Sequence, residues 1–137
     1  MSEERQVLIE RNDVQVMFKR VADEESAIGR GIAEVEEAVG SLRGRKCYGA
    51  FGATAGEYWA CVQLREGDEA DALGLEVGTL PGGRYARVRL QGDPPDLYGR
   101  IAPAFERLAA RADHDRSRPG IEFYRRHDTI DLLLPIT

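Results

Sequence analysis

Two spacings of apolar residues follow one another in the first third of the chain. The run Val14-Gln15-Val16-Met17-Phe18-Lys19 alternates and predicts a half-buried strand. Apolar residues then recur at helical spacing, at Ile28, Ile32, Val35, Val39 and Leu42. This spacing predicts an amphipathic helix. Asp23 can cap its start, and Gly40 or Gly44 can end it.

Two short runs of strand-forming residues come next, at 46–51 and 57–64, joined by a small glycine-bounded link. This pattern predicts a β-hairpin. If the turn is centred on the link, Tyr48 lies opposite Cys61, and Tyr48 and Trp59 become diagonal neighbours on one face. A slip of one residue would separate the two rings.

The second half repeats this order of elements after a charged loop. A strand is expected near 73–80, followed by a turn at Pro81-Gly82-Gly83 and an alternating strand at 85–90. Asp93-Pro94-Pro95-Asp96 then opens a second helix. Its buried stripe is expected to consist of Leu97, Ile101, Phe105 and Leu108. Pro103 lies within this helix and should kink it or split it in two.

The tail reads as a second hairpin in which each strand carries an acid. The runs 118–124 and 130–136 are joined by the polar turn 125–128, and they contain Glu122 and Asp131 among apolar neighbours. A carboxylate in a half-buried strand is costly unless a positive or hydrogen-bonding group compensates it. Both acids therefore need an explanation, and a ligand is one candidate.

Helices separated by antiparallel hairpins imply an α+β fold. The length of 137 residues fits one domain that spans residues 1–137. The polar residues 1–12 are expected to be frayed, although Val7-Leu8-Ile9 can begin a strand.

Composition narrows the class of protein. The chain has 42% hydrophobic and 31% charged residues, which is typical of a soluble globular protein. Its net charge of −5 argues against direct nucleic-acid binding, and no helix-turn-helix pattern is present. No run is long enough to cross a membrane. Cys47 and Cys61 form no disulfide framework, and no leader opens the chain, so a cytoplasmic location is expected. His114 and His127 lack ligand-like partners, and we expect neither a metal nor a cofactor.

Three local patterns, in this order and spacing, resemble the GyrI-like domain, also called the bacterial effector-binding domain, of the SOUL-like superfamily. The first is the turn Leu80-Pro81-Gly82-Gly83-Arg84-Tyr85-Ala86, and the second is Ile121-Glu122-Phe123-Tyr124. The third is the closing strand Ile130-Asp131-Leu132-Leu133-Leu134-Pro135-Ile136. The likeness covers the chain from about Val14 to Ile136.

The resemblance implies two β-α-β-β units in a pseudo-two-fold arrangement: an antiparallel sheet with two helices and a central cleft. Members of the family bind amphipathic, often cationic or aromatic small molecules in that cleft. In multidrug-sensing relatives, an acid on the last strand meets the ligand's charge. Asp131 matches that position and is one methylene shorter than the usual glutamate. Some relatives are described as hydrolases that open cyclopropane-bearing toxins, and one binds and inhibits DNA gyrase.

The candidate ligand-binding residues each have a structural alternative. Asp131 can face a cleft or solvent, and Glu122 can contact a ligand or be satisfied by backbone donors or a nearby tyrosine. Trp59 and Tyr48 can wall a cleft, where cation–π attraction is worth roughly 0.5–2 kcal/mol, or pack in the core. The remaining candidates are Tyr85 and Tyr124, the latter on the same side as Glu122.

The leading hypothesis is a stand-alone protein that binds amphipathic, cationic or planar aromatic molecules beside an acid. A hydrolase acting on strained electrophiles is the alternative, with Glu122 or Asp131 activating water. A protein-partner role, such as restraint of gyrase, is the third. An exposed sheet edge would permit a homodimer, although no sequence feature fixes one. The deciding geometric question is whether Asp131, Glu122 and Trp59 line one common hollow.

Overall fold

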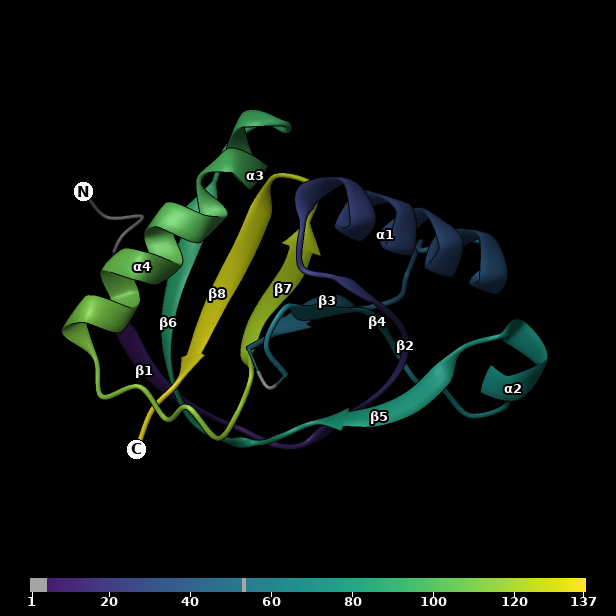
Figure 1. Ribbon diagram of the computed structural model, residues 1–137, viewed down its shortest axis with the longest axis horizontal. Coiled ribbons are helices and arrows are strands. Elements are labelled where there is room, and N and C mark those ends of the chain that lie inside the picture. Colours follow the sequence, from purple (N-terminus) through teal and green to yellow (C-terminus); the bar gives the residue numbers. More distant parts are fainter. Residues whose placement is uncertain (1–4, 53) are drawn as a thin grey trace.

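The computed structural model describes residues 5–52 and 54–137 (Figure 1). Its elements in chain order are β1 (Val7–Arg11), β2 (Val14–Ala22), α1 (Glu25–Val39), β3 (Cys47–Phe51), β4 (Glu57–Gln63), α2 (Ala70–Leu73), β5 (Glu76–Leu80), β6 (Gly83–Gln91), α3 (Asp96–Gly99), α4 (Ile101–Arg111), β7 (Gly120–Arg126) and β8 (Thr129–Pro135). The strands form one antiparallel sheet, which confirms the expected α+β class.

The sheet is built from two equivalent halves. Its strand order is β1-β6-β8-β7-β3-β4-β2-β5, so that β6-β8-β7 on one side of the centre corresponds to β2-β4-β3 on the other. The edge strands are exchanged between the halves. β1 precedes β2 in the chain but pairs with β6, and β5 precedes β6 but pairs with β2. Each half therefore completes the sheet of the other.

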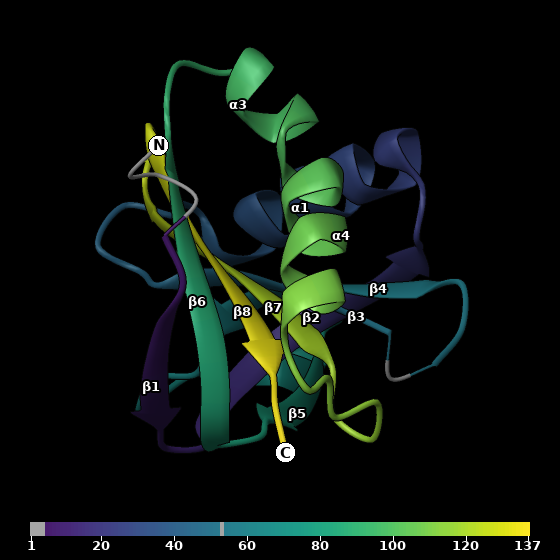
Figure 2. The ribbon, with the colours of Figure 1, turned by 90° about the vertical axis from the view of Figure 1, so that its left-hand side faces the viewer.

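The sheet is curled, and its two faces are filled differently. Both long helices, α1 and α4, cover the same face, on either side of β7 and β8 (Figures 1 and 2). Leu97 and Leu108 of α3 and α4 pack against β6 and β8, while Val35 of α1 packs against β2 and β4. The opposite face forms an inner core, which includes Phe18 and Leu133. We call these the helix face and the inner face.

The expected register of the first hairpin is confirmed. Tyr48 pairs with Cys61, and Ala50 pairs with Trp59, so Tyr48 and Trp59 share the inner face. The first helix ends at Gly40, whose φ of 85° lies in the left-handed region that glycine adopts without strain.

The segment 73–80 differs from the expectation of a continuous strand. Ala70–Leu73 forms the short helix α2, and the strand begins only at Glu76. Ala70 and Leu75 are buried against the core residues beneath α1. This packing holds the segment against the domain. A helix of only four residues is too short for its apolar pattern to show a helical period.

Pro103 is accommodated by a break in the second helix, as expected. The helix divides into α3 and α4 at Arg100, so that Pro103 lies in the first turn of α4. Backbone N–H groups in a first turn have no partner within the helix, and the donor that proline lacks is not needed there.

The N-terminal segment is more ordered than expected where it is described. Val7–Arg11 forms the edge strand β1, paired with β6, which confirms the alternative that Val7-Leu8-Ile9 begins a strand. Residues 1–4, where fraying is also expected, lie outside the described residues. In the described ranges, no helix has both the length and the apolar character that crossing a bilayer requires.

Candidate functional site

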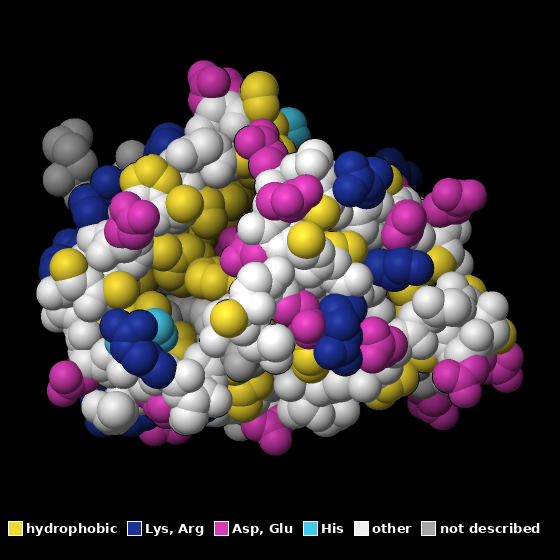
Figure 3. Space-filling view, viewed as in Figure 1, with side chains coloured by type: hydrophobic (Ala, Val, Ile, Leu, Met, Phe, Trp, Pro, Cys, Tyr) yellow, Lys and Arg dark blue, Asp and Glu magenta, His cyan; other side chains and the backbone are white. Residues whose placement is uncertain are grey.

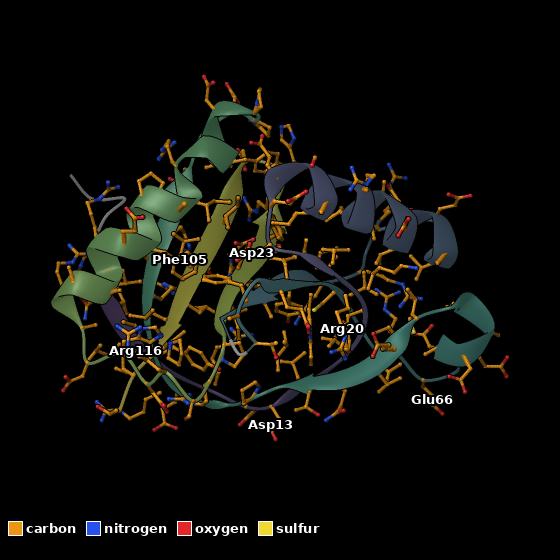
Figure 4. The ribbon with its side chains drawn as sticks, viewed as in Figure 1. Asp13, Arg20, Asp23, Glu66, Phe105 and Arg116 are labelled. Atoms are coloured by element: carbon orange, nitrogen blue, oxygen red, sulfur yellow. The ribbon has the colours of Figure 1, made fainter. Side chains whose placement is uncertain are left out.

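A hollow lined by apolar side chains opens on the helix face between α4 and α1 (Figure 3). Figure 4 shows Phe105 of α4 on one side of it and Asp23, which precedes α1, on the other. β7 and β8 run between the two helices (Figure 1). We call this hollow the groove.

Glu122 of β7 faces this side of the sheet and is 8% exposed. The Tyr58 hydroxyl donates a hydrogen bond to its Oε1 at 2.8 Å, and the Tyr124 hydroxyl donates to the same oxygen at 2.5 Å. The two hydroxyl oxygens are 3.3 Å apart. The carboxylate is thus compensated by two neutral donors on one oxygen.

Gly49 makes room for this cluster. It pairs with Glu122 across β3 and β7. A Cβ atom at position 49 would lie 1.7 Å from the Tyr58 hydroxyl oxygen and 2.8 Å from Glu122 Oε1. Glycine inside a strand commonly marks such a close approach, and this was the one signal in the sequence that could have pointed to Tyr58.

Burial dominates the electrostatics of the cluster. It raises the pKa of Glu122, while the hydrogen bonds from Tyr124 and Tyr58 act in the opposite direction. Burial also raises the pKa of both Tyr58 and Tyr124 well above the ordinary value, and the neighbouring Glu122 charge adds to this. Both hydroxyls therefore keep their protons and act as donors.

Aromatic rings form the α4 side of the groove. Phe51 of β3 meets Phe105 of α4 edge-on, with ring centroids 4.8 Å apart and an interplanar angle of 80°. Phe51, Ile101 and Tyr124 are partly buried and pack against the core beneath α4. A ligand in the groove would meet apolar surface beside the Glu122 carboxylate, with Asp23 on the opposite side of the hollow.

Asp131 lies on the inner face, opposite to Glu122. It pairs with Phe123 across β7 and β8 and is 3% exposed. Arg89 donates to its two oxygens, from Nε at 2.7 Å and from Nη2 at 3.2 Å. Arg125 Nη1 donates at 3.4 Å. This carboxylate is compensated by two arginines from neighbouring strands.

The three other predicted aromatic residues also lie on the inner face. The ring of Trp59 stacks on Phe18 with centroids 3.8 Å apart, and Tyr48 stacks on Phe123 at 4.9 Å. Tyr85 is fully buried, and its hydroxyl donates to the Pro81 carbonyl.

Of the six predicted residues, the structure therefore brings only Glu122 and Tyr124 together, and it adds Tyr58. Asp131, Glu122 and Trp59 do not line one common hollow, because the sheet separates Glu122 from the other two. Within the described ranges, no three His, Cys, Asp or Glu side chains are grouped so that they could hold a metal ion.

Several solved structures share this fold. An integron cassette protein from the mobile metagenome of Vibrio cholerae matches with a TM-score of 0.75 at 13% identity, over 96% of this chain and 95% of its own. SAV2435 bound to tetraphenylphosphonium matches with a TM-score of 0.66 at 17% identity, over 97% and 94%. The C-terminal domain of EcmrR matches with a TM-score of 0.63 at 14% identity, over 97% of both chains.

The observed fold is consistent with the GyrI-like fold that the sequence resemblance implies. Two structures described as hydrolases from Listeria innocua also match, with TM-scores of 0.56 and 0.59 at 10% and 8% identity; they cover 97% and 98% of this chain and 92% of their own. At identities this low, the likeness shows the fold alone. No protein-family model matches the sequence, and no curated protein matches it.

Proposed function

We propose that the protein is a small-molecule-binding domain that holds an amphipathic cation in the groove, with Glu122 as the countercharge. The observation that carries this proposal is the contrast between the two buried acids. Asp131 has two arginine partners, whereas the hydrogen bonds described for Glu122 come from two neutral hydroxyls. A buried carboxylate without a positive partner is costly, and a bound cation would remove that cost.

The groove offers both parts of such an interaction. Its apolar walls supply affinity, at roughly 25 cal/mol for each Å² of apolar surface that the ligand buries. Glu122 supplies selectivity, because it favours a cation and disfavours an anion of equal shape. The tetraphenylphosphonium-bound structure of SAV2435, which shares the fold, supports this ligand class.

Calorimetric titration with tetraphenylphosphonium tests the proposal. We expect saturable binding by the wild type. Glu122→Gln should lower the affinity roughly tenfold, because a partly buried ion pair between the ligand and Glu122 is worth about 1–2 kcal/mol. Tetraphenylborate, an anion of the same shape, should not bind. The proposal fails if both ions bind equally, or if Glu122→Gln leaves the affinity for tetraphenylphosphonium unchanged.

The same titration of Asp131→Asn tests the role that the sequence predicts for Asp131. That substitution lies on the inner face, so we expect near wild-type affinity once the variant is shown to be folded. If Asp131→Asn alone lowered the affinity for tetraphenylphosphonium, the ligand would instead be assigned to the inner face.

The second candidate function is hydrolysis of a strained electrophile in the same groove. Its specific support is the position of Glu122 beside two protonated tyrosine hydroxyls, which provides a base and a proton donor within hydrogen-bonding distance. We expect any turnover of a cyclopropane-containing electrophile to fall in both Glu122→Gln and Tyr58→Phe. Products that form at the rate seen in buffer alone would remove this candidate.

The remaining predictions are unchanged by the structure. A protein-partner role such as gyrase restraint, the absence of direct nucleic-acid binding, a homodimer and a cytoplasmic location all stay predictions.

A further inference from the structure

A second concavity lies at the end of the sheet, beside the face that carries Trp59. Its volume is about 280 Å³, and its walls come from the end of the β3–β4 hairpin, the end of β5 and the segments before β2 and β7. Its lining includes Trp59, Phe51, Pro81 and Pro119. We call it the Trp59 pocket. Its volume is near the lower end of the range of about 300–1,000 Å³ for ligand sites and fits a molecule of one or two rings.

Trp59 forms a rigid aromatic wall in this pocket. One face of its indole stacks on Phe18, with an interplanar angle of 9°. Its Nε1 donates to Glu57 Oε1 at 3.1 Å, which fixes the ring in its plane. The indole is nevertheless only partly buried, so part of this well-held ring borders the cavity. A preorganised aromatic surface of this kind suits a planar ligand.

The charges around the pocket select the sign of the ligand. Among the described residues that line it, the charged ones are Asp13 and Glu57, and both are acidic. Arg20 lies beside the indole, with its guanidinium carbon 5.9 Å from the ring centroid, and it pairs with Glu57 at 3.1 Å and with Glu76 at 2.9 Å. Two carboxylates thus pair with one guanidinium, and Asp13, in the turn before β2, is a third acid that lines the cavity apart from this group.

We propose that the Trp59 pocket is a second binding site, which takes a small aromatic cation of one or two rings. The cation would contact the indole and the two proline rings and would lie near the Asp13 carboxylate. This site is independent of the groove, because Trp59 and Glu122 project from opposite faces of the sheet. The two sites share only Phe51 among the residues that carry the argument.

Trp59 is also the reporter, because the chain contains one tryptophan. We would titrate the full chain with N-methylpyridinium, a one-ring cation that quenches indole fluorescence on contact. Saturable quenching is expected, in contrast to the linear collisional quenching of free N-acetyltryptophanamide. Benzoate, a one-ring anion, should give no saturable change.

Two rim substitutions localise the site. Asp13→Asn keeps an oxygen for the hydrogen bond from the Gly82 N–H and removes the charge. Thr79→Arg adds a cation on the exposed edge strand β5, and Thr79→Gln is the neutral control of similar size. We expect Asp13→Asn and Thr79→Arg to weaken binding about two- to fivefold, as for exposed charge pairs, and Thr79→Gln to have no effect.

Glu122→Gln separates the two sites. The proposal predicts unchanged quenching by N-methylpyridinium in this variant, whatever happens to tetraphenylphosphonium binding. It is overturned if quenching stays linear up to the solubility limit of the probe, if neither charge change at the rim weakens it, or if Glu122→Gln abolishes it.

Discussion

Glu122 and Asp131 show how the partners of a side chain decide what it can do. Both are acids in neighbouring strands, and both are nearly inaccessible. Arginine partners neutralise Asp131 within the fold, and they raise the net cost of removing either member of the group. Hydroxyl partners leave the Glu122 charge in place. The same residue class therefore gives a structural ion pair on one face and a candidate binding group on the other.

The raised pKa of Glu122 predicts a pH-dependent stability difference. Because the folded-state pKa lies above the ordinary value of 4.5, folding disfavours the ionised form, and this residue lowers stability as the pH rises through its folded pKa. Below the ordinary pKa the carboxyl is neutral in both states and carries no such penalty.

Glu122→Gln should therefore be at least as stable as the wild type at neutral pH, although it binds cations less well. We expect its advantage in Tm, measured by thermal unfolding, to be near zero below the ordinary pKa of 4.5 and to grow as the pH rises above it. A variant that is less stable at neutral pH than at pH 4, relative to the wild type, would contradict the assignment.

At the scale of elements, the sequence predicts most of the fold because each pattern is local. Alternation and helical spacing locate β2 and α1, and a short glycine-bounded link fixes the register of β3 and β4. The faces of the tail hairpin could not be predicted in this way. The pairing of β7 with β8 is irregular between Tyr124 and Arg126. Since one extra residue reverses which side chains share a face, counting through the turn does not place Glu122 relative to Asp131.

The break between α3 and α4 makes a prediction about Pro103. It lies where the helix needs no backbone donor, so Pro103→Ala should change the free energy of unfolding by less than about 1 kcal/mol. Leu108→Ala in the same helix should lower it by about 2–5 kcal/mol, because Leu108 is fully buried against the sheet. Urea unfolding of the two variants checks this. A large loss of free energy of unfolding in Pro103→Ala would contradict the view that the helix break accommodates the proline without strain.

At the scale of the whole molecule, the exchange of edge strands ties the two halves together. β1 pairs only with β6, and β5 pairs only with β2, among the strand pairings described. The halves also meet along the β3–β7 pairing at the centre of the sheet. Neither half keeps a complete sheet without the other.

A chain cut in the charged loop between β4 and α2 should therefore fold only when both parts are present. Fragments 1–66 and 67–137 should each give the circular dichroism of an unfolded chain, and an equimolar mixture should recover the β-sheet signal. Independent folding of either fragment would show that the exchanged edges are dispensable.

The hydrogen bond from Tyr58 to Glu122 crosses this boundary, because Tyr58 belongs to β4 and Glu122 to β7. A cation bound to that carboxylate, as proposed, would be coupled to the first half of the chain through this hydrogen bond and would lie on the second half. Ligand binding and folding would then be thermodynamically linked, so that a ligand that binds only the folded domain raises its free energy of unfolding.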